Sequence, residues 1–230
     1  MSHFTVGVIH RADQDIEELL APYDENKEVE PYIRFTRQEA IDYARKNYTS
    51  AAGKTDEECW QMVAEDEKTD EDGNILSTYN RQSTWDWWTV GGRWRDMLRL
   101  KDGSTANTAR IGDIDFTMDD EAYRRCLRFW DVVVEHQPPK EGEDFFSFFN
   151  EAYYRGFYGD RETYARHQAA FSTYAVITPA GVWYAKGKMG WWAMSSETPE
   201  EARDWEEHFK ERFIDAFDED MILTIVDCHI

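Results

Sequence analysis

Short runs of apolar, β-branched residues mark the two ends of the chain. Residues 4–10 (FTVGVIH) and 221–230 (MILTIVDCHI) are too short for typical helices and favour strands. A hairpin is predicted over residues 171–187, because Pro179 and Gly181 supply a turn between two apolar stretches. Strands at both ends with helices between them predict that one sheet organises the chain.

Helix starts between these strands share one capping device. In a capping box, a Ser or Thr side chain accepts from the backbone N–H three residues later, and an acidic side chain at that position reaches back. Four pairs fit this pattern: Thr36 with Glu39, Thr55 with Glu58, Thr117 with Asp120, and Thr198 with Glu201. Another long helix is predicted over residues 144–156, ended by Gly156. After Thr198, apolar residues recur at spacings of three and four: Ala202, Trp205, Phe209, Phe213 and Phe217.

This order of elements predicts the α+β class. We expect a single domain, residues 1–230, with a mostly antiparallel sheet and several amphipathic helices packed on it. A chain of 230 residues can bury enough surface to be stable without a metal or a disulfide.

The cysteines Cys59, Cys126 and Cys228 are far apart, which favours free thiols in a reducing compartment. The N-terminus lacks a basic segment and a long apolar run, so we expect a cytoplasmic protein without a membrane span.

The net charge of the chain disfavours some classes of binding partner. The chain has 26 basic and 47 acidic residues, a formal net charge of −21. Such a surface repels nucleic acid and anionic membranes, so neither is expected as a direct partner. A solvated acidic surface explains this composition, and so does a protein that mimics DNA to occupy the cleft of a nucleic-acid-binding protein.

One segment departs from this acidity. Residues 81–101 carry five basic and two acidic side chains. Interpreted as a strand, residues 93–100 place Arg93, Arg95 and Arg99 on one face and mainly apolar side chains, with Asp96, on the other. Arg93 and Arg95 would then lie about 6.6 Å apart, a spacing that suits two phosphates held by guanidinium groups. Pairing of these arginines with the acidic helices is the structural alternative.

Aromatic residues surround this arginine segment. Indole faces can stack on bases, each worth roughly 1–3 kcal/mol, and Gly91-Gly92 allows a tight turn or a close backbone approach. No phosphate-loop motif is present. Packing in the core is the alternative role for the tryptophans. The expected ligand-binding residues are Tyr79, Asn80, Trp85, Asp86, Trp87, Trp88, Arg93, Arg95, Trp191 and Trp192.

Sequence motifs for catalysis are weaker than those for ligand binding. The six histidines form no HExxH or HxH motif, and the chain has no GxSxG elbow and no paired-cysteine zinc site. If the first and last strands pair, His10 could approach Asp227 and His229 and form a general base or a metal site. Ordinary polar residues at strand ends explain the same residues. We therefore assign no catalytic residue, no metal and no cofactor. The sequence favours a protein that is not an enzyme.

A resemblance adds biological context. The blocks MSHFTVGVI, LAPYDEN, STYN, WDWWTVGGRW, GDIDF, FYGD, FSTYAV, GWW, SSETPEEA and VDCHI resemble an uncharacterised family encoded mostly by bacteriophages and some bacteria. The resemblance implies an accessory protein that works in the host bacterial cytoplasm against host defence. Members of that family usually have a small or polar residue after GGRW, where this chain has Arg95, which favours Arg93 as the main anion contact.

These observations predict a phage accessory protein that binds and sequesters a nucleotide-like small molecule, such as a cyclic-dinucleotide or ADP-ribose-type immune signal. Two alternatives stay open: an acidic inhibitor or DNA mimic that blocks a host defence protein, and a hydrolase using His10, Asp227 and His229. A host defence protein and a second copy of the chain, in a homo-oligomer, are the further candidate partners.

Overall fold

Two compact units make up the chain. The computed structural model describes residues 2–190 and 194–230. Met1–Ala21 and Thr84–Ile230 form the larger unit, and Pro22–Ser83 forms the smaller one. Helices packed on a mostly antiparallel sheet confirm the α+β class, whereas the assignment of residues 1–230 to one domain stays a prediction.

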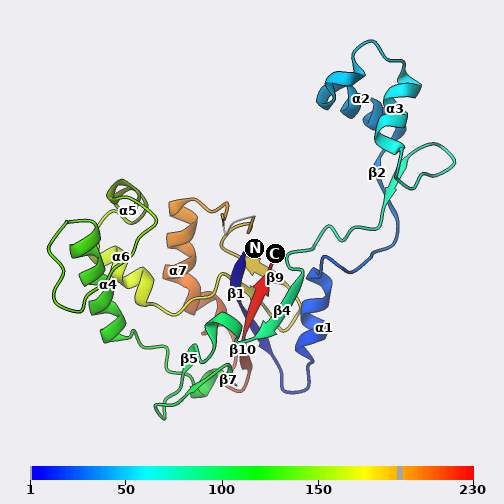
Figure 1. The fold of residues 1–230 in the computed structure, drawn as a ribbon. Helices are drawn as coiled ribbons and strands as arrows, with labels where there is room; N and C mark the ends of the chain where they lie inside the picture. Colours follow the sequence, from blue (N-terminus) through cyan, green and yellow to red (C-terminus); the bar gives the residue numbers. More distant parts are fainter. Residues whose placement is uncertain (1, 191–193) are drawn as a thin grey trace. The chain divides into compact units, whose positions relative to one another are not determined.

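A mixed sheet forms the centre of the larger unit (Figure 1). Its strand order is β4-β10-β1-β8-β9, with β7 also paired to β10. β1 runs antiparallel to β10 and parallel to β8. The expected terminal strands and hairpin are therefore confirmed. The strands are β1 (His3–His10), β4 (Trp87–Val90), β7 (Thr108–Arg110), β8 (Ala175–Ile177), β9 (Trp183–Ala185) and β10 (Ile222–His229).

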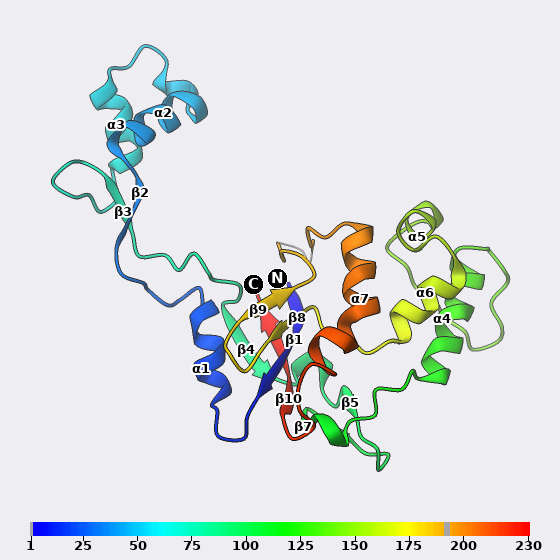
Figure 2. The ribbon, with the colours of Figure 1, turned by 180° about the vertical axis from the view of Figure 1, so that it is seen from behind.

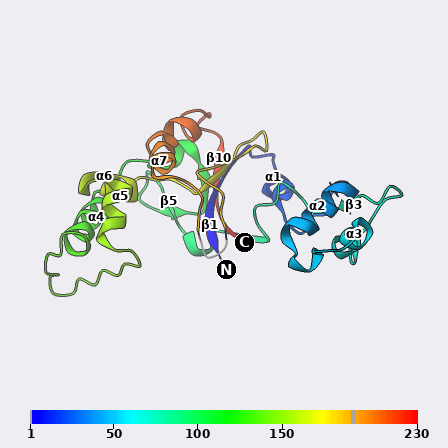
Figure 3. The same cartoon turned by 90° about the horizontal axis from the view of Figure 1, so that it is seen from above.

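Burial on both faces explains why β1 and β10 are near-continuous apolar runs. The helix α7 (Pro199–Phe213) packs Trp205, Phe209 and Phe213 into a core with residues from both strands. This helix lies along one side of the sheet (Figure 3), and the capping box of Thr198 with Glu201 starts it as predicted. A short helix, α1 (Ile16–Leu20), follows β1 and contributes two buried leucines.

Three helices form a second, aromatic core in the larger unit (Figure 2). They are α4 (Asp120–Val133), α5 (Glu151–Tyr158) and α6 (Arg161–Ala169). The predicted start at Thr117 is wrong, because Asp119 caps α4 and Thr117 bonds to Asp115 instead.

The helix predicted over residues 144–156 is also wrong in its bounds. Asn150 caps α5 by accepting from the Tyr153 N–H, so the helix begins at Glu151. It continues through Gly156 to Tyr158, and Gly159, with φ of +78°, provides the C-cap. A left-handed residue after the last turn ends a helix more effectively than a glycine within it.

The smaller unit pairs two short strands with two helices. β2 (Tyr32–Phe35) and β3 (Ile75–Ser77) are antiparallel. Both predicted capping boxes are present and start α2 (Arg37–Asn47) and α3 (Asp56–Ala64). Their shared core contains the buried side chain of Cys59.

The strand predicted over residues 93–100 is wrong. Residues Gly92–Trp94 form a turn of 3₁₀ helix (η3), and only Leu98–Arg99 form a strand (β5), which pairs with β6 (Thr105–Ala106). Gly91, Gly92 and Asp96 have positive φ angles, which an extended strand does not use. The expected alternation of arginines on one face is therefore lost. The other 3₁₀ turns are η1 (Ala21–Tyr23), η2 (Thr49–Ala51) and η4 (Ile111–Asp113).

Candidate functional site

Three aromatic rings lie side by side where β1 starts and β10 ends. The register places His229 on β10 opposite both His3 on β1 and Trp87 on β4, and cross-strand neighbours of this kind are in contact. Trp87 stacks on His229, with ring centroids 5.3 Å apart and planes at 15°. His3 meets both rings edge-on, at 5.0 Å from His229 and 5.4 Å from Trp87. We call His3, Trp87 and His229 the ring cluster.

A carboxylate holds each imidazole of the ring cluster. Asp227 precedes His229 by two residues, and its Oδ1 lies 2.8 Å from His3 Nδ1. Asp86 precedes Trp87, and its Oδ1 lies 2.6 Å from His229 Nδ1. An ionised carboxylate only accepts hydrogen bonds, so each Nδ1 carries a proton and each neutral ring keeps its lone pair on Nε2. The result is two neighbouring His–Asp dyads.

The side chains of the ring cluster and of the carboxylates that hold it differ sharply in solvent exposure. The Asp227 side chain is 3% exposed, His229 7% and His3 12%, whereas Trp87 is 44% exposed. The Nε2 atom of His229 is buried and has no hydrogen-bond partner among the described residues. Leaving a buried polar atom unpaired costs roughly 1–3 kcal/mol, so such an atom in a native protein needs an explanation.

The glycine pair positions Asp227. The backbone N–H of Arg93 donates to Asp227 Oδ2 over 2.9 Å, so both carboxylate oxygens have a donor. Gly92 has φ of +52°, and a Cβ there would overlap the Asp227 side chain. Gly91 has φ of +73°, and its Cβ would lie 2.7 Å from Asn107 Oδ1. The expected tight turn is present, and its close approach is to these two side chains.

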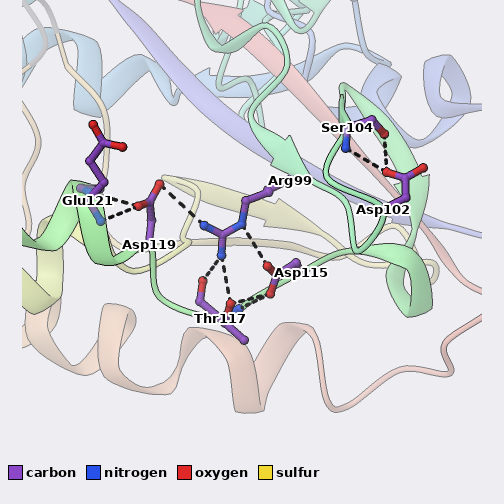
Figure 4. Close-up of polar contacts among 8 residues, drawn as sticks. Arg99, Asp102, Ser104, Asp115, Thr117, Asp119 and Glu121 are labelled. Carbon is purple, nitrogen blue, oxygen red and sulfur yellow. Dashed lines mark hydrogen bonds and ion pairs between the residues drawn. The ribbon is translucent and has the colours of Figure 1, made fainter.

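The arginines of this segment have separate roles. Arg99 pairs with Asp115 at 3.1 Å and Asp119 at 3.6 Å, and it also donates to Thr117 (Figure 4). Arg99 is therefore paired with acidic side chains of the protein itself, which was the alternative to an anion-binding role. Arg93 and Arg95 are exposed, and within the described part of the chain their guanidinium groups make no ion pair. The backbone of Arg93 lies beside the dyads, because its N–H donates to Asp227.

The structure separates the expected tryptophans. Trp87 lies in the ring cluster, but Trp88 is opposite Cys228 in the register, and successive strand residues point to opposite faces. Trp85 is only 5% exposed, so it presents little surface for stacking. Trp191 and Trp192 lie outside the described residues.

Tyr79 and Asn80 belong to the smaller unit. The Asn80 amide donates to the backbone oxygens of Pro22 and Asp24, over 2.7 and 3.0 Å, and its side chain is buried. These bonds give Asn80 a role in holding the local chain. Tyr79 is exposed, and its hydroxyl accepts a hydrogen bond from Ser83 over 2.6 Å.

The terminal strands pair as expected, but they do not bring His10 to the other two residues. His10 is opposite Ile222, five residues from Asp227 and so about 17 Å along the strand at ~3.4 Å per residue. It lies on the other face, where its Nε2 is 3.1 Å from Thr224 Oγ1. The prediction of a His10, Asp227 and His229 group is wrong, and His3 takes the place given to His10. Antiparallel pairing of the chain ends was the signal that could have found His3.

A second buried histidine–carboxylate pair lies between α6 and α7. It borders a cavity of about 220 Å³ lined in part by His167, Glu206 and Arg166. His167 Nδ1 is 2.5 Å from Glu206 Oε2, and Lys186 Nζ is 3.8 Å from the other oxygen of Glu206. Glu206 therefore has two basic neighbours, and the ring next to His167 is that of Tyr158, with centroids 6.0 Å apart. The ring cluster is the stronger candidate for ligand recognition.

The two dyads contain four His and Asp side chains, but these are not placed as the ligands of a zinc site. Within residues 2–190 and 194–230, no group of three or more His, Cys, Asp or Glu side chains is placed to hold a metal ion. Protein zinc sites use three or four such ligands. Proton transfer and hydrogen bonding are the chemistry that the chain's own residues offer here.

Comparison with known proteins gives no relative from which a role could be transferred. No family model, no curated protein and no solved structure matches the chain. The resemblance to a phage-encoded family therefore stays a prediction. Across the described residues, no helix combines the length and apolarity needed to cross a membrane.

Proposed function

We propose that the protein binds a nucleotide-like small molecule at the ring cluster and sequesters it. The observation that carries the proposal is the support of Trp87. Its half-exposed indole stacks on His229, which Asp86 holds through Nδ1. A base can stack on the exposed part of this indole, and a base–aromatic stack contributes roughly 1–3 kcal/mol.

Polar groups beside Trp87 suit a phosphate. His3 is oriented by Asp227, so its Nε2 is available to a ligand at the edge of the indole. Exposed Arg93 and Arg95 add positive charge to this segment of an acidic chain. Guanidinium groups bind phosphate bidentately, and they can do so wherever the flexible side chains reach it.

The net charge of −21 favours a small ligand over a polymer. A long nucleic acid meets the repulsion of the whole surface, whereas a dinucleotide meets mainly the local field. A cyclic dinucleotide or an ADP-ribose derivative that serves as a host immune signal fits this size. We propose a phage counter-defence role in the bacterial cytoplasm on this basis and on the sequence resemblance.

Calorimetric titration tests the proposal with 3′,5′-cyclic di-AMP, 3′,5′-cyclic di-GMP and ADP-ribose as probes. Trp87→Ala should weaken binding of the active probe about 5- to 150-fold, since a base–aromatic stack contributes roughly 1–3 kcal/mol. Trp88→Ala is the matched control, because it removes the same side chain from the opposite face of the same strand. Binding by none of the probes, or equal losses in the two variants, would refute the site.

The second candidate function is an acidic inhibitor or DNA mimic of a host nucleic-acid-binding defence protein. The charge of −21 favours it. It predicts salt-dependent binding to such a protein, with duplex DNA as a competitor and Trp87→Ala without effect. Failure of DNA to compete would exclude it.

A further inference from the structure

We propose that the two His–Asp dyads cleave the bound ligand by acid–base catalysis. The substrate class is a ribonucleotide 3′–5′ phosphodiester with a neighbouring 2′-hydroxyl, as in a 3′,5′-cyclic dinucleotide. This inference rests on the proposed function, because the phosphodiester must be held at the ring cluster.

The arrangement of the dyads carries the inference. Asp227 and Asp86 fix Nδ1 of His3 and of His229, which leaves each Nε2 to accept or donate a proton. The ring centroids are 5.0 Å apart. In an in-line displacement the attacking and leaving oxygens lie on opposite sides of phosphorus, so one group cannot easily serve both. Two neighbouring imidazoles supply two separate groups for the two oxygens.

The reaction balances without another reactant. Neutral His3 takes the proton of the 2′-hydroxyl on Nε2, and the 2′-oxygen forms a bond to phosphorus. The bond from phosphorus to the 5′-oxygen breaks, and protonated His229 gives its Nε2 proton to that oxygen. The products are a 2′,3′-cyclic phosphate and a free 5′-hydroxyl. One proton is taken and one is given, so the net charge of the pair is unchanged, and proton exchange with water restores neutral His3 and protonated His229.

Burial assigns the two roles. His3 is the more exposed imidazole and meets the attacking hydroxyl, whereas His229 lies beneath Trp87 with its Nε2 covered. The mechanism therefore requires Trp87, with the base stacked on it, to move off His229 as the phosphodiester enters. The unpartnered Nε2 of His229 then gains the leaving oxygen as its partner. Catalytic hydrogen bonds commonly form only in the substrate complex.

The test compares 3′,5′-cyclic di-AMP with its analogue that lacks both 2′-hydroxyls. The first product has the mass of the substrate, so chromatography and the phosphorus NMR signal of the five-membered cyclic phosphate are needed to detect it. The expected result is conversion of the ribonucleotide, unaffected by EDTA, with a bell-shaped pH profile, and binding without conversion of the deoxy analogue. His3→Gln and His229→Gln should each lower the rate about 10²- to 10⁴-fold.

Glutamine keeps an amide that can donate to the partner carboxylate but cannot exchange a proton. Binding of the deoxy analogue reports whether each variant is folded. His208→Gln is the control, because His208 is an exposed histidine on α7 that pairs only with Asp204 among the described residues.

The outcomes separate the two proposals. Binding of both probes without conversion overturns the catalytic inference and leaves ligand capture standing. Binding of neither probe removes the ligand site and the catalysis with it. Conversion of the deoxy analogue, or loss of conversion in EDTA, contradicts the 2′-hydroxyl mechanism.

Discussion

Replacement of Gly92 by alanine tests how the turn after β4 supports the dyads. Gly92 has φ of +52°, and an added Cβ would overlap the Cβ and Oδ2 atoms of Asp227. Asp227 cannot easily yield, because it is 3% exposed and is held by His3 and by the Arg93 N–H. The substitution must therefore shift either the turn or the carboxylate.

The magnitude follows from two contributions. A non-glycine residue in a left-handed conformation costs roughly 1–3 kcal/mol. Overpacking against a fixed side chain adds roughly 1–3 kcal/mol. Gly103→Ala is the matched control, since Gly103 has φ of +87° but an added Cβ would meet no atom within 4 Å. The two variants should therefore differ by the overpacking contribution alone.

Urea unfolding followed by circular dichroism measures this difference in the free energy of unfolding. Gly92→Ala should be less stable than Gly103→Ala by about 1–3 kcal/mol, equivalent to about 2–12 °C in Tm for a chain of this size. Gly92→Ala should also lose ligand binding, whereas Gly103→Ala should retain it. Equal stability of the two variants would refute the close approach of Gly92 to Asp227.

Three further predictions concern titratable groups. Burial raises the pKa of the Cys228 thiol, so iodoacetamide should label it slowly near neutral pH in the native protein and rapidly in urea; equal rates, read by mass spectrometry, would contradict this. Burial raises the pKa of Tyr174 to about 12, above the unfolded value of about 10, so its contribution to the free energy of unfolding should fall between about pH 10 and about pH 12. Tyr174→Phe should make alkaline unfolding less pH-dependent, and an unchanged slope would contradict the assignment. Hydrogen bonds from Arg128 lower the pKa of Glu143 to about 2, so the stabilisation is complete above the unfolded pKa of about 4.3 and is lost as pH falls towards 2. Glu143→Gln should flatten acid unfolding in that window, and an unaltered urea midpoint profile would count against the pair.

Local signals predicted much of the fold. The capping boxes at Thr36, Thr55 and Thr198 involve residues only three apart, so the sequence contains the whole interaction. The buried strands at the chain ends were also predictable, because burial on both faces leaves an apolar run.

The features that the sequence analysis did not predict depend on contacts between residues that are separated along the chain. The chain from Gly91 to Asp96 is not extended, because the turn packs on Asp227 and the Asp96 N–H donates to Asn107. Asp227 is 134 residues from Arg93, and Asn107 is 11 residues from Asp96. His3 was overlooked for the same reason, since only the register of β1 against β10 places it beside His229. Trp87 and Asp86 were predicted as site residues, and the structure places both at the ring cluster.

Imidazole NMR during a ligand titration tests the central claim most directly. Long-range ¹H–¹⁵N spectra report the tautomer of each histidine and any change at its nitrogens. In the unliganded protein, His3 and His229 should carry their protons on Nδ1, as their carboxylate partners require. Addition of the probe that binds in calorimetry should shift the Nε2 signal of His3 with the same Kd and leave His208 unchanged. A neutral His3 or His229 ring that is protonated on Nε2 instead of Nδ1, or saturation of binding without a change at either ring, would contradict the account.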